Sequence, residues 1–178
     1  MKKIKLLSIV IGIVLLLFSC KSVLQAKPKV NIDNVQWEVK MGINYLDDRA
    51  VMVEFNNNTE YTITELALEF KMKENIEEET LDDFYSHLKK EYNLSEDDVK
   101  ELRETEISMN SHVYLDEDEY IEKGQKVEET LLYGIKFIRT LDYYDLFEPE
   151  MYRIEYIDEL GEEHTTYYDY LNSTYTEK

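Results

Sequence analysis

Alternating apolar and polar residues dominate the chain after its first 34 positions. Val35, Trp37, Val39 and Met41 fall on one face of an extended segment, and the residues between them are polar or charged. Side chains of a β-strand point to opposite faces in turn, so this period of two predicts a strand with one buried face. The same alternation predicts further strands at 51–55, 61–72, 107–115, 127–138, 152–156 and 163–170.

Polar turns separate several of these strands. The asparagine-rich stretch 56–60 follows the second strand and predicts a hairpin with the segment 61–72. The inward-facing parity changes between Thr64 and Glu65, as it does at a β-bulge or where a strand bends into another sheet. Gly161 is free to take a positive φ in a tight turn, so we expect the chain to close with a hairpin.

Residues 80–104 follow a helical period instead. Apolar residues recur at intervals of three and four within 80–92, which predicts a helix. Thr80 followed by Asp83 predicts a capping box at the start of this helix. Ser95 begins a second capping signal before another short helix, so an α-helical hairpin is predicted as an insertion between strands.

The order of these elements predicts the fold class. Strands that do not alternate with helices, together with only five glycines, favour antiparallel sheets over a parallel one. We therefore expect a mainly β protein, an antiparallel immunoglobulin-like β-sandwich over 32–172 with the helical hairpin inserted at 80–104. Tyr152 and Tyr156 are expected in its core, and 173–178 is expected to form a C-terminal tail.

The amino terminus has a different pattern. A short basic region, residues 1–5, precedes an uncharged apolar run of 13 residues at 6–18. This order is typical of a signal peptide. A helix of that length spans about 20 Å, which is short of the roughly 30 Å of bilayer hydrocarbon. Residues 1–19 are therefore predicted to be a signal peptide.

Residues 17–20, Leu-Phe-Ser-Cys, resemble the lipobox of bacterial lipoproteins, although Phe18 departs slightly from the small or β-branched residue that is usual at its position. The resemblance implies a lipid on the Cys20 thiol and cleavage between Ser19 and Cys20. Several acyl chains hold a protein on a membrane far more firmly than one. Residues 20–31 are then the lipidated cysteine and a tether that reaches about 35 Å when extended. The alternative is an ordinary secreted protein whose cysteine is incidental.

Lipobox, tether and one sandwich in this order resemble small Gram-positive surface lipoproteins with a single immunoglobulin-like (FxLYD-like) domain. The stretches that carry the resemblance are 51–59 and 61–63, Val-Met-Val-Glu-Phe-Asn-Asn-Asn-Thr and Tyr-Thr-Ile. It implies a lipid-anchored protein on the extracytoplasmic face of the cell membrane, without catalytic residues. The helical hairpin departs from a plain sandwich, so no family partner is carried over to this chain.

The charge of the chain limits its partners. Three lysines in the predicted signal peptide contribute to the net charge of −19, so the rest of the chain carries −22. Such a surface repels phosphate backbones, which excludes nucleic acid as a partner. It suits cationic partners, divalent ions or simple solubility. Because Cys20 is the only cysteine, no intramolecular disulfide is possible.

Candidate chemistry is sparse. His87, His112 and His164 are isolated in the sequence. No two of them are four residues apart, the spacing that lets two imidazoles on one helical face bind zinc. A Gly-x-Ser-x-Gly motif is missing, and the carboxylates are too abundant for any pair to be informative. We therefore expect no enzyme and no cofactor.

One acidic segment offers oxygen ligands for calcium. Asp116, Asp118 and Glu122 lie close together in the sequence but lack the ligand spacing and the glycine of an EF-hand loop. A solvated turn is the favoured interpretation, and a calcium-dependent or enzymatic module is the lower alternative.

Tyrosines are the candidate contact residues. Tyr143 and Tyr144, and Tyr167 and Tyr168, form adjacent pairs in which one ring is expected to face inward and the other outward. The sequence thus predicts a non-catalytic binding or accessory module of the cell envelope, with a protein partner at the helical hairpin or the outward tyrosines. An immunity or inhibitor lipoprotein that neutralises a cationic toxin or an envelope enzyme is the alternative.

Overall fold

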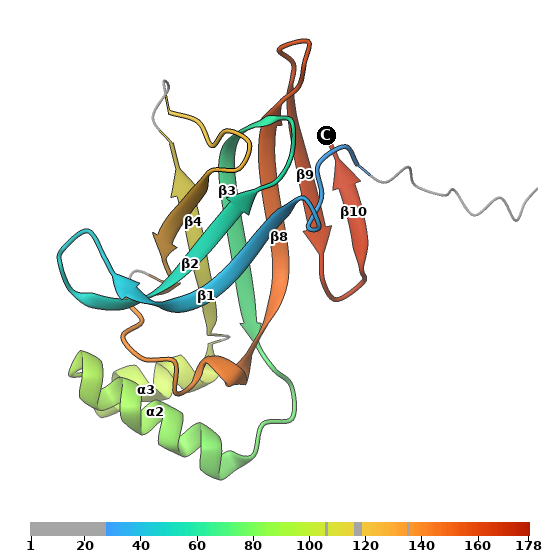
Figure 1. Cartoon of the computed structure of the whole chain (residues 1–178). Helices are drawn as coiled ribbons and strands as arrows, with labels where there is room; N and C mark the ends of the chain where they lie inside the picture. Colours follow the sequence, from blue (N-terminus) through green and yellow to red (C-terminus); the bar gives the residue numbers. More distant parts are fainter. Residues whose placement is uncertain (1–27, 106, 116–118, 135) are drawn as a thin grey trace, which may run out of the picture.

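The computed structural model describes residues 28–105, 107–115, 119–134 and 136–178. These residues form ten β-strands, two α-helices and one short 3-10 helix (Figure 1). The strands are β1 (Val35–Ile43), β2 (Arg49–Asn57), β3 (Thr62–Met72), β4 (Ser108–Tyr114), β5 (Lys126–Thr130), β6 (Leu132–Tyr133), β7 (Lys136–Phe137), β8 (Phe147–Ile157), β9 (Glu163–Asp169) and β10 (Thr174–Glu177). The helices are α2 (Glu78–Tyr92), α3 (Glu96–Glu104) and η1 (Tyr144–Leu146).

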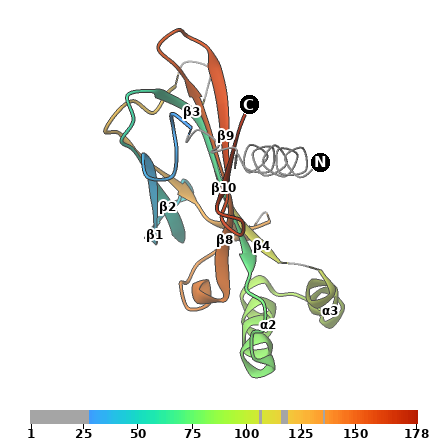
Figure 2. The same ribbon diagram turned by 90° about the vertical axis from the view of Figure 1, so that its right-hand side faces the viewer.

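The strands are arranged in two antiparallel sheets. One has three strands in the order β1-β2-β5, and the other has seven in the order β10-β9-β8-β3-β4-β6-β7. Figure 2 shows β1 and β2 as a layer beside the layer that contains β3, β8 and β9. The prediction of a mainly β protein with antiparallel sheets is confirmed.

Aromatic residues fill the space between the two sheets. The ring of Phe55 in β2 stacks on Tyr152 in β8, with 6.0 Å between the centroids. Trp37 in β1 meets Phe70 in β3 edge-on at 5.5 Å. Tyr152 and Tyr156 are both fully buried, as predicted. Contacts of this kind bury the alternate residues that made the strands recognisable in the sequence.

β2 and β3 belong to different sheets, so the predicted hairpin between 51–55 and 61–72 is wrong. The buried Asn57 organises the crossing between the sheets. Its Nδ2 donates to the carbonyl oxygens of Tyr61 at 2.9 Å and Ile121 at 2.8 Å. Its Oδ1 accepts from the backbone N–H of Thr59 at 2.9 Å. A side chain therefore satisfies backbone groups that a hairpin ladder would otherwise pair.

The predicted single strand 127–138 is divided into β5, β6 and β7. β5 pairs with β2 in one sheet, whereas β6 pairs with β4 in the other. Leu131 lies between β5 and β6, is fully buried, and donates its N–H to the carbonyl of Val51 at 2.9 Å. Alternation identified the extended segment but did not reveal that it changes sheets.

Two local predictions for β3 and the closing hairpin are confirmed. The register between β3 and β8 shifts between Ile63 and Glu65, where the parity of the inward residues changes. Gly161 has a φ of 79° in the turn between β8 and β9. The prediction of a C-terminal tail at 173–178 is wrong. These residues contain strand β10, which pairs with β9, and Tyr175 packs against Tyr168 at 4.6 Å.

The helical hairpin is confirmed as two helices, α2 and α3. Helix α2 has Glu77 at its N-cap without a side-chain hydrogen bond, so the predicted capping box at Thr80 and Asp83 is wrong. Helix α3 has the predicted cap, in which the backbone N–H of Asp98 donates to Ser95 Oγ at 3.1 Å. The backbone N–H of Ser95 donates in return to Asp98 Oδ2 at 2.7 Å.

The hairpin closes one end of the core. Helix α2 buries Phe84, Tyr85 and Leu88. The ring of Phe84 lies 6.0 Å from Tyr133 and 5.9 Å from Phe147, both of the seven-stranded sheet. Figure 1 shows both helices below the ends of the strands. No helix in the described ranges is long and apolar enough to cross a membrane.

Residues 28–31, which were predicted to belong to the tether, pack onto the domain. Pro28 and Val30 are buried, and the carbonyl of Asn31 accepts from the backbone N–H groups of Asn34 at 2.9 Å and Val35 at 3.0 Å. The predicted tether 20–31 therefore overlaps the folded domain in its last four residues.

Candidate functional site

The turn between β8 and β9 is built around one carboxylate. Asp158 Oδ1 accepts from the backbone N–H groups of Leu160 at 2.8 Å and Glu162 at 3.0 Å. The backbone N–H of Asp158 donates to the carbonyl of Glu162 at 3.0 Å. The Asp158 side chain is only 4% exposed. These bonds fix the orientation of the carboxylate and leave Oδ2 facing its remaining partners.

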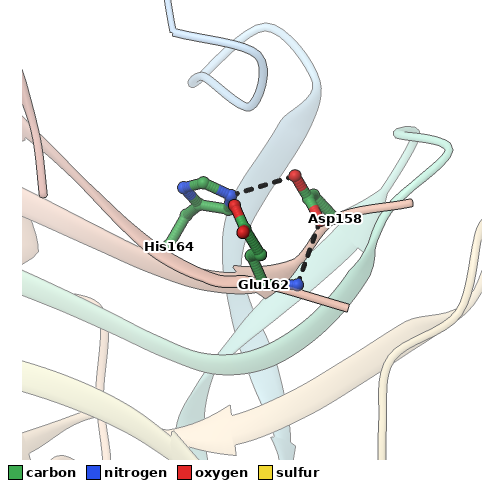
Figure 3. Close-up of side chains that lie close together, drawn as sticks. All are labelled: Asp158, Glu162 and His164. Atoms are coloured by element: carbon green, nitrogen blue, oxygen red, sulfur yellow. Dashed lines mark hydrogen bonds and ion pairs between the residues drawn. The ribbon is translucent and has the colours of Figure 1, made fainter. Parts of the chain in front are cut away.

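Asp158 Oδ2 faces two basic groups. His164 Nε2 in β9 lies at 3.1 Å, and Lys29 Nζ of the amino-terminal segment lies at 3.3 Å. The His164 ring also stacks on Tyr156, with 5.2 Å between the centroids. Figure 3 shows that Asp158, Glu162 and His164 point toward one another. One ligand-type atom of each lies within 4.8 Å of the others.

The donors around Asp158 determine its charge. The N–H of Glu162 makes the largest contribution in holding the pKa of the carboxyl well below its usual value, and Leu160, His164 and Lys29 add to it against the opposing effect of burial. The hydrogen bond to Asp158 also raises the pKa of Lys29. Asp158 is therefore an anion at neutral pH and ties the amino-terminal segment to the β8–β9 hairpin across 129 positions of sequence.

The last residue of β1 and the loop that follows it expose large apolar side chains. Ile43 is 60% exposed, Tyr45 78% and Leu46 56%. We call these three residues the apolar tip. They account for three of the eight large hydrophobic residues that are exposed in the described part of the chain. Clusters of exposed apolar side chains mark interaction surfaces more often than isolated ones do.

The loop that carries the apolar tip is held by its own hydrogen bonds. Asn44 is buried, and its Oδ1 accepts from the backbone N–H groups of Leu46 at 2.9 Å and Asp48 at 3.0 Å. Asp47 has a φ of 62°, a left-handed conformation that aspartate tolerates better than most residues. The Tyr45 ring meets Phe137 edge-on at 5.7 Å. The tip is thus presented by an ordered loop.

A third group of side chains lies on the outer face of the seven-stranded sheet. Glu65 Oε1 accepts from Arg153 and also contacts His112 Nε2, and Arg153 Nη2 lies 3.0 Å from His112 Nε2. Arg153 also lies 3.7 Å from Glu155, whose pKa is raised, first by burial and then by the nearby charge of Glu65. The two acids and two bases pair with one another, so we assign this group a role in stabilising the sheet.

The predicted contact tyrosines lie in two separate parts of the fold. Near helix α2, the Tyr143 hydroxyl donates to Asp83 Oδ2 at 2.8 Å, and the Tyr144 ring packs against Phe70 at 5.8 Å. Both side chains are half-buried. Their expected role as a free contact surface stays a prediction, but the rings already have partners within the domain.

The second tyrosine pair lies on β9. The Tyr168 ring meets Tyr170 edge-on at 4.7 Å on the inward face. Tyr167 lies on the outer face, where Lys178 Nζ stands 5.2 Å from its ring centroid. The inward and outward arrangement of this pair follows the strand alternation.

The remaining predicted residues are in different positions. Cys20, Ser19, Asp116 and Asp118 lie outside the described residues. Glu122 is exposed in a turn, where its backbone N–H donates to the side chain of Gln125 at 2.7 Å.

Our sequence interpretation treated His164 as isolated and missed its neighbours Asp158 and Glu162. A signal was available, because the predicted tight turn at Gly161 places the residues on its two sides at one end of a hairpin.

We found no match for this chain among protein families, curated proteins or solved structures. The resemblance to small surface lipoproteins therefore rests on the sequence motifs alone.

Proposed function

We propose that this protein is a lipid-anchored, non-catalytic binding module on the extracytoplasmic face of a bacterial membrane. The lipobox-like residues 17–20 support the anchor. The two antiparallel sheets support an immunoglobulin-like sandwich as the finer description of the domain. The observation that carries the binding role is the exposed apolar tip between β1 and β2.

The apolar tip has the properties of a binding anchor. Burying a large apolar side chain contributes about 1.5–3 kcal/mol, so three such residues supply substantial binding free energy. The hydrogen bonds of Asn44 already order the loop, and a loop that is ordered before binding loses less conformational entropy. This interpretation replaces the tyrosine pairs as the favoured contact surface, because all four of their side chains are half-buried whereas the side chains of the tip are exposed.

The position of the tip agrees with an anchored protein. The chain reaches the domain at one end of β1, and the tip lies at the other end (Figure 1). The nine residues of β1 separate the two ends by about 30 Å. A lipid on Cys20 would hold the near end within about 28 Å of the membrane, the reach of the chain from Cys20 to Pro28. The tip is then free for a partner in the envelope.

A photo-crosslinking amino acid at position 45 tests the binding role in cells that produce the protein. We expect one crosslinked adduct, which disappears when Leu46→Ser is combined with the same crosslinker. The matched control has the crosslinker at Leu160, which is 82% exposed at the β8–β9 turn. Equal adducts at both positions, or none at position 45, would contradict the proposal.

The salt dependence of the adduct discriminates the alternative. If the partner is a cationic toxin or envelope enzyme, the yield at position 45 should fall steeply with ionic strength, because the chain after the predicted signal peptide carries −22. A yield that is independent of salt favours an apolar contact with an envelope protein.

A further inference from the structure

Asp158, Glu162 and His164 combine one imidazole with two carboxylates. Imidazole nitrogen and carboxylate oxygen are ligands that zinc accepts, whereas calcium prefers oxygen alone. Three protein ligands leave a fourth tetrahedral position for water, as in open zinc sites. The set therefore has the chemistry and the number of ligands that a zinc-type ion needs.

The geometry of the three side chains suits such an ion. Ligand bonds of 2.0–2.1 Å at tetrahedral angles place two ligand atoms about 3.3 Å apart. His164 Nε2 and Asp158 Oδ2 lie 3.1 Å apart. The third ligand atom, on Glu162, lies within 4.8 Å of both, and this side chain is exposed and free to approach. Of the three ligands, only the glutamate has to move.

The surroundings of Asp158 provide the support that a metal ligand requires. Its Oδ1 is fixed by two backbone N–H groups, and outer bonds of this kind orient a coordinating carboxylate. Asp158 Oδ2 already contacts a positive charge, because Lys29 Nζ lies 3.3 Å away. Lys29 is 54% exposed and is attached by a flexible chain, so it can leave. The position is thus one that holds a cation.

We propose that Asp158, Glu162 and His164 form a binding site for a divalent transition-metal ion of the zinc type. On binding, the proton that His164 Nε2 donates to Asp158 passes to solvent, and the ring coordinates through the Nε2 lone pair with its proton on Nδ1. The metal also replaces the Lys29 ammonium at Asp158 Oδ2. The site is independent of the lipid anchor and of the apolar tip.

Zinc titration of the full-length chain tests this site. All variants carry Cys20→Ser, so that no thiol competes for the metal, and circular dichroism confirms that each is folded. We expect one saturable Zn²⁺ site. His164→Ala and Glu162→Gln should each weaken it by about tenfold or more. Lys29→Met should tighten it by up to about fivefold, because a competing charge is removed.

The control is Glu159→Gln, which removes an exposed carboxylate from the same turn and changes the net charge as Glu162→Gln does. It should leave the affinity unchanged. Substitution of Co²⁺ should give the visible spectrum of a tetrahedral site, and His164→Ala should abolish it. Equal weakening by Glu159→Gln and Glu162→Gln, or unchanged binding in His164→Ala, would show diffuse attraction to an acidic surface and overturn the proposal.

Discussion

Glu54 lies on the outer face of the three-stranded sheet between two lysines. Its carboxylate accepts from Lys126 and, at 2.5 Å, from Lys40 Nζ, and its side chain is 14% exposed. The hydrogen bonds from Lys126 and then from Lys40 lower the pKa of Glu54 to about 2. The chain has 39 acidic and 20 basic residues, and two of its lysines form ion pairs with Glu54 that link the neighbouring strands β1, β2 and β5.

These ion pairs predict a dependence of stability on pH. A carboxyl with a lowered pKa stabilises the fold above its unfolded pKa of about 4.3, and the contribution is lost as the pH falls toward about 2. Glu54→Gln should lower the free energy of unfolding at pH 7 and flatten its decline between about pH 4.5 and 2. Urea unfolding across this range measures both effects. The same flattening in the exposed-turn variant Glu159→Gln would contradict the assignment to Glu54.

Asp158 gives a second prediction at the scale of a residue. Asp158→Asn keeps an oxygen for the N–H groups of Leu160 and Glu162 but removes the charge that attracts Lys29. The amino-terminal segment should then open more often, so backbone N–H groups at 34 and 35 should exchange hydrogen faster, while the β8–β9 ladder changes little. Hydrogen-exchange mass spectrometry measures this. Unchanged exchange at 34 and 35 would show that the packing and backbone hydrogen bonds of residues 28–31 hold the segment without the ion pair.

At the scale of elements, helix α2 contributes more to the core than helix α3. Phe84 is fully buried, whereas no residue of α3 is buried. Phe84→Ala should therefore lower the free energy of unfolding by about 3–5 kcal/mol. Ser95→Ala, which removes the cap of α3, should cost about 1 kcal/mol. Urea unfolding of both variants checks that Phe84→Ala loses more unfolding free energy than Ser95→Ala. A loss below 1 kcal/mol for Phe84→Ala would mean that the hairpin does not close the core.

Local patterns predicted elements, and long-range pairing decided how they are arranged. The cap at Ser95 and the bulge before Glu65 depend on a few neighbouring residues, so both were visible in the sequence. The crossings at Asn57 and Leu131 depend on partners at positions 121 and 51. Alternation describes the two faces of a strand but not the sheet to which it belongs, so these crossings were missed.

At the scale of the whole molecule, the candidate sites also differ in whether they depend on local sequence or on contacts between distant residues. The exposure of Ile43, Tyr45 and Leu46 follows from a loop whose burial depends on the rest of the fold. Lys29 and Asp158 meet across almost the whole domain, and nothing in the sequence near Lys29 identifies its partner. The lipobox-like segment 17–20 is the opposite case, because a lipobox is a short contiguous motif and can be predicted from the sequence alone.

The proposed lipid anchor predicts the behaviour of the intact protein in cells. Cys20→Ser should leave the domain folded, because the core described for the structure is built from residues within 28–178, but should release it from the membrane fraction or leave an uncut precursor. Fractionation with an antibody against the domain measures this. Retention of a processed Cys20→Ser protein on the membrane would require another means of attachment.

Mass spectrometry of the amino-terminal peptide of the mature protein tests the central claim most directly. We predict that this peptide begins at Cys20 and carries the mass of a diacylglyceryl group on the cysteine sulfur. A mature protein that begins at another residue, or that carries Cys20 as an unmodified thiol, would contradict a lipid-anchored binding module.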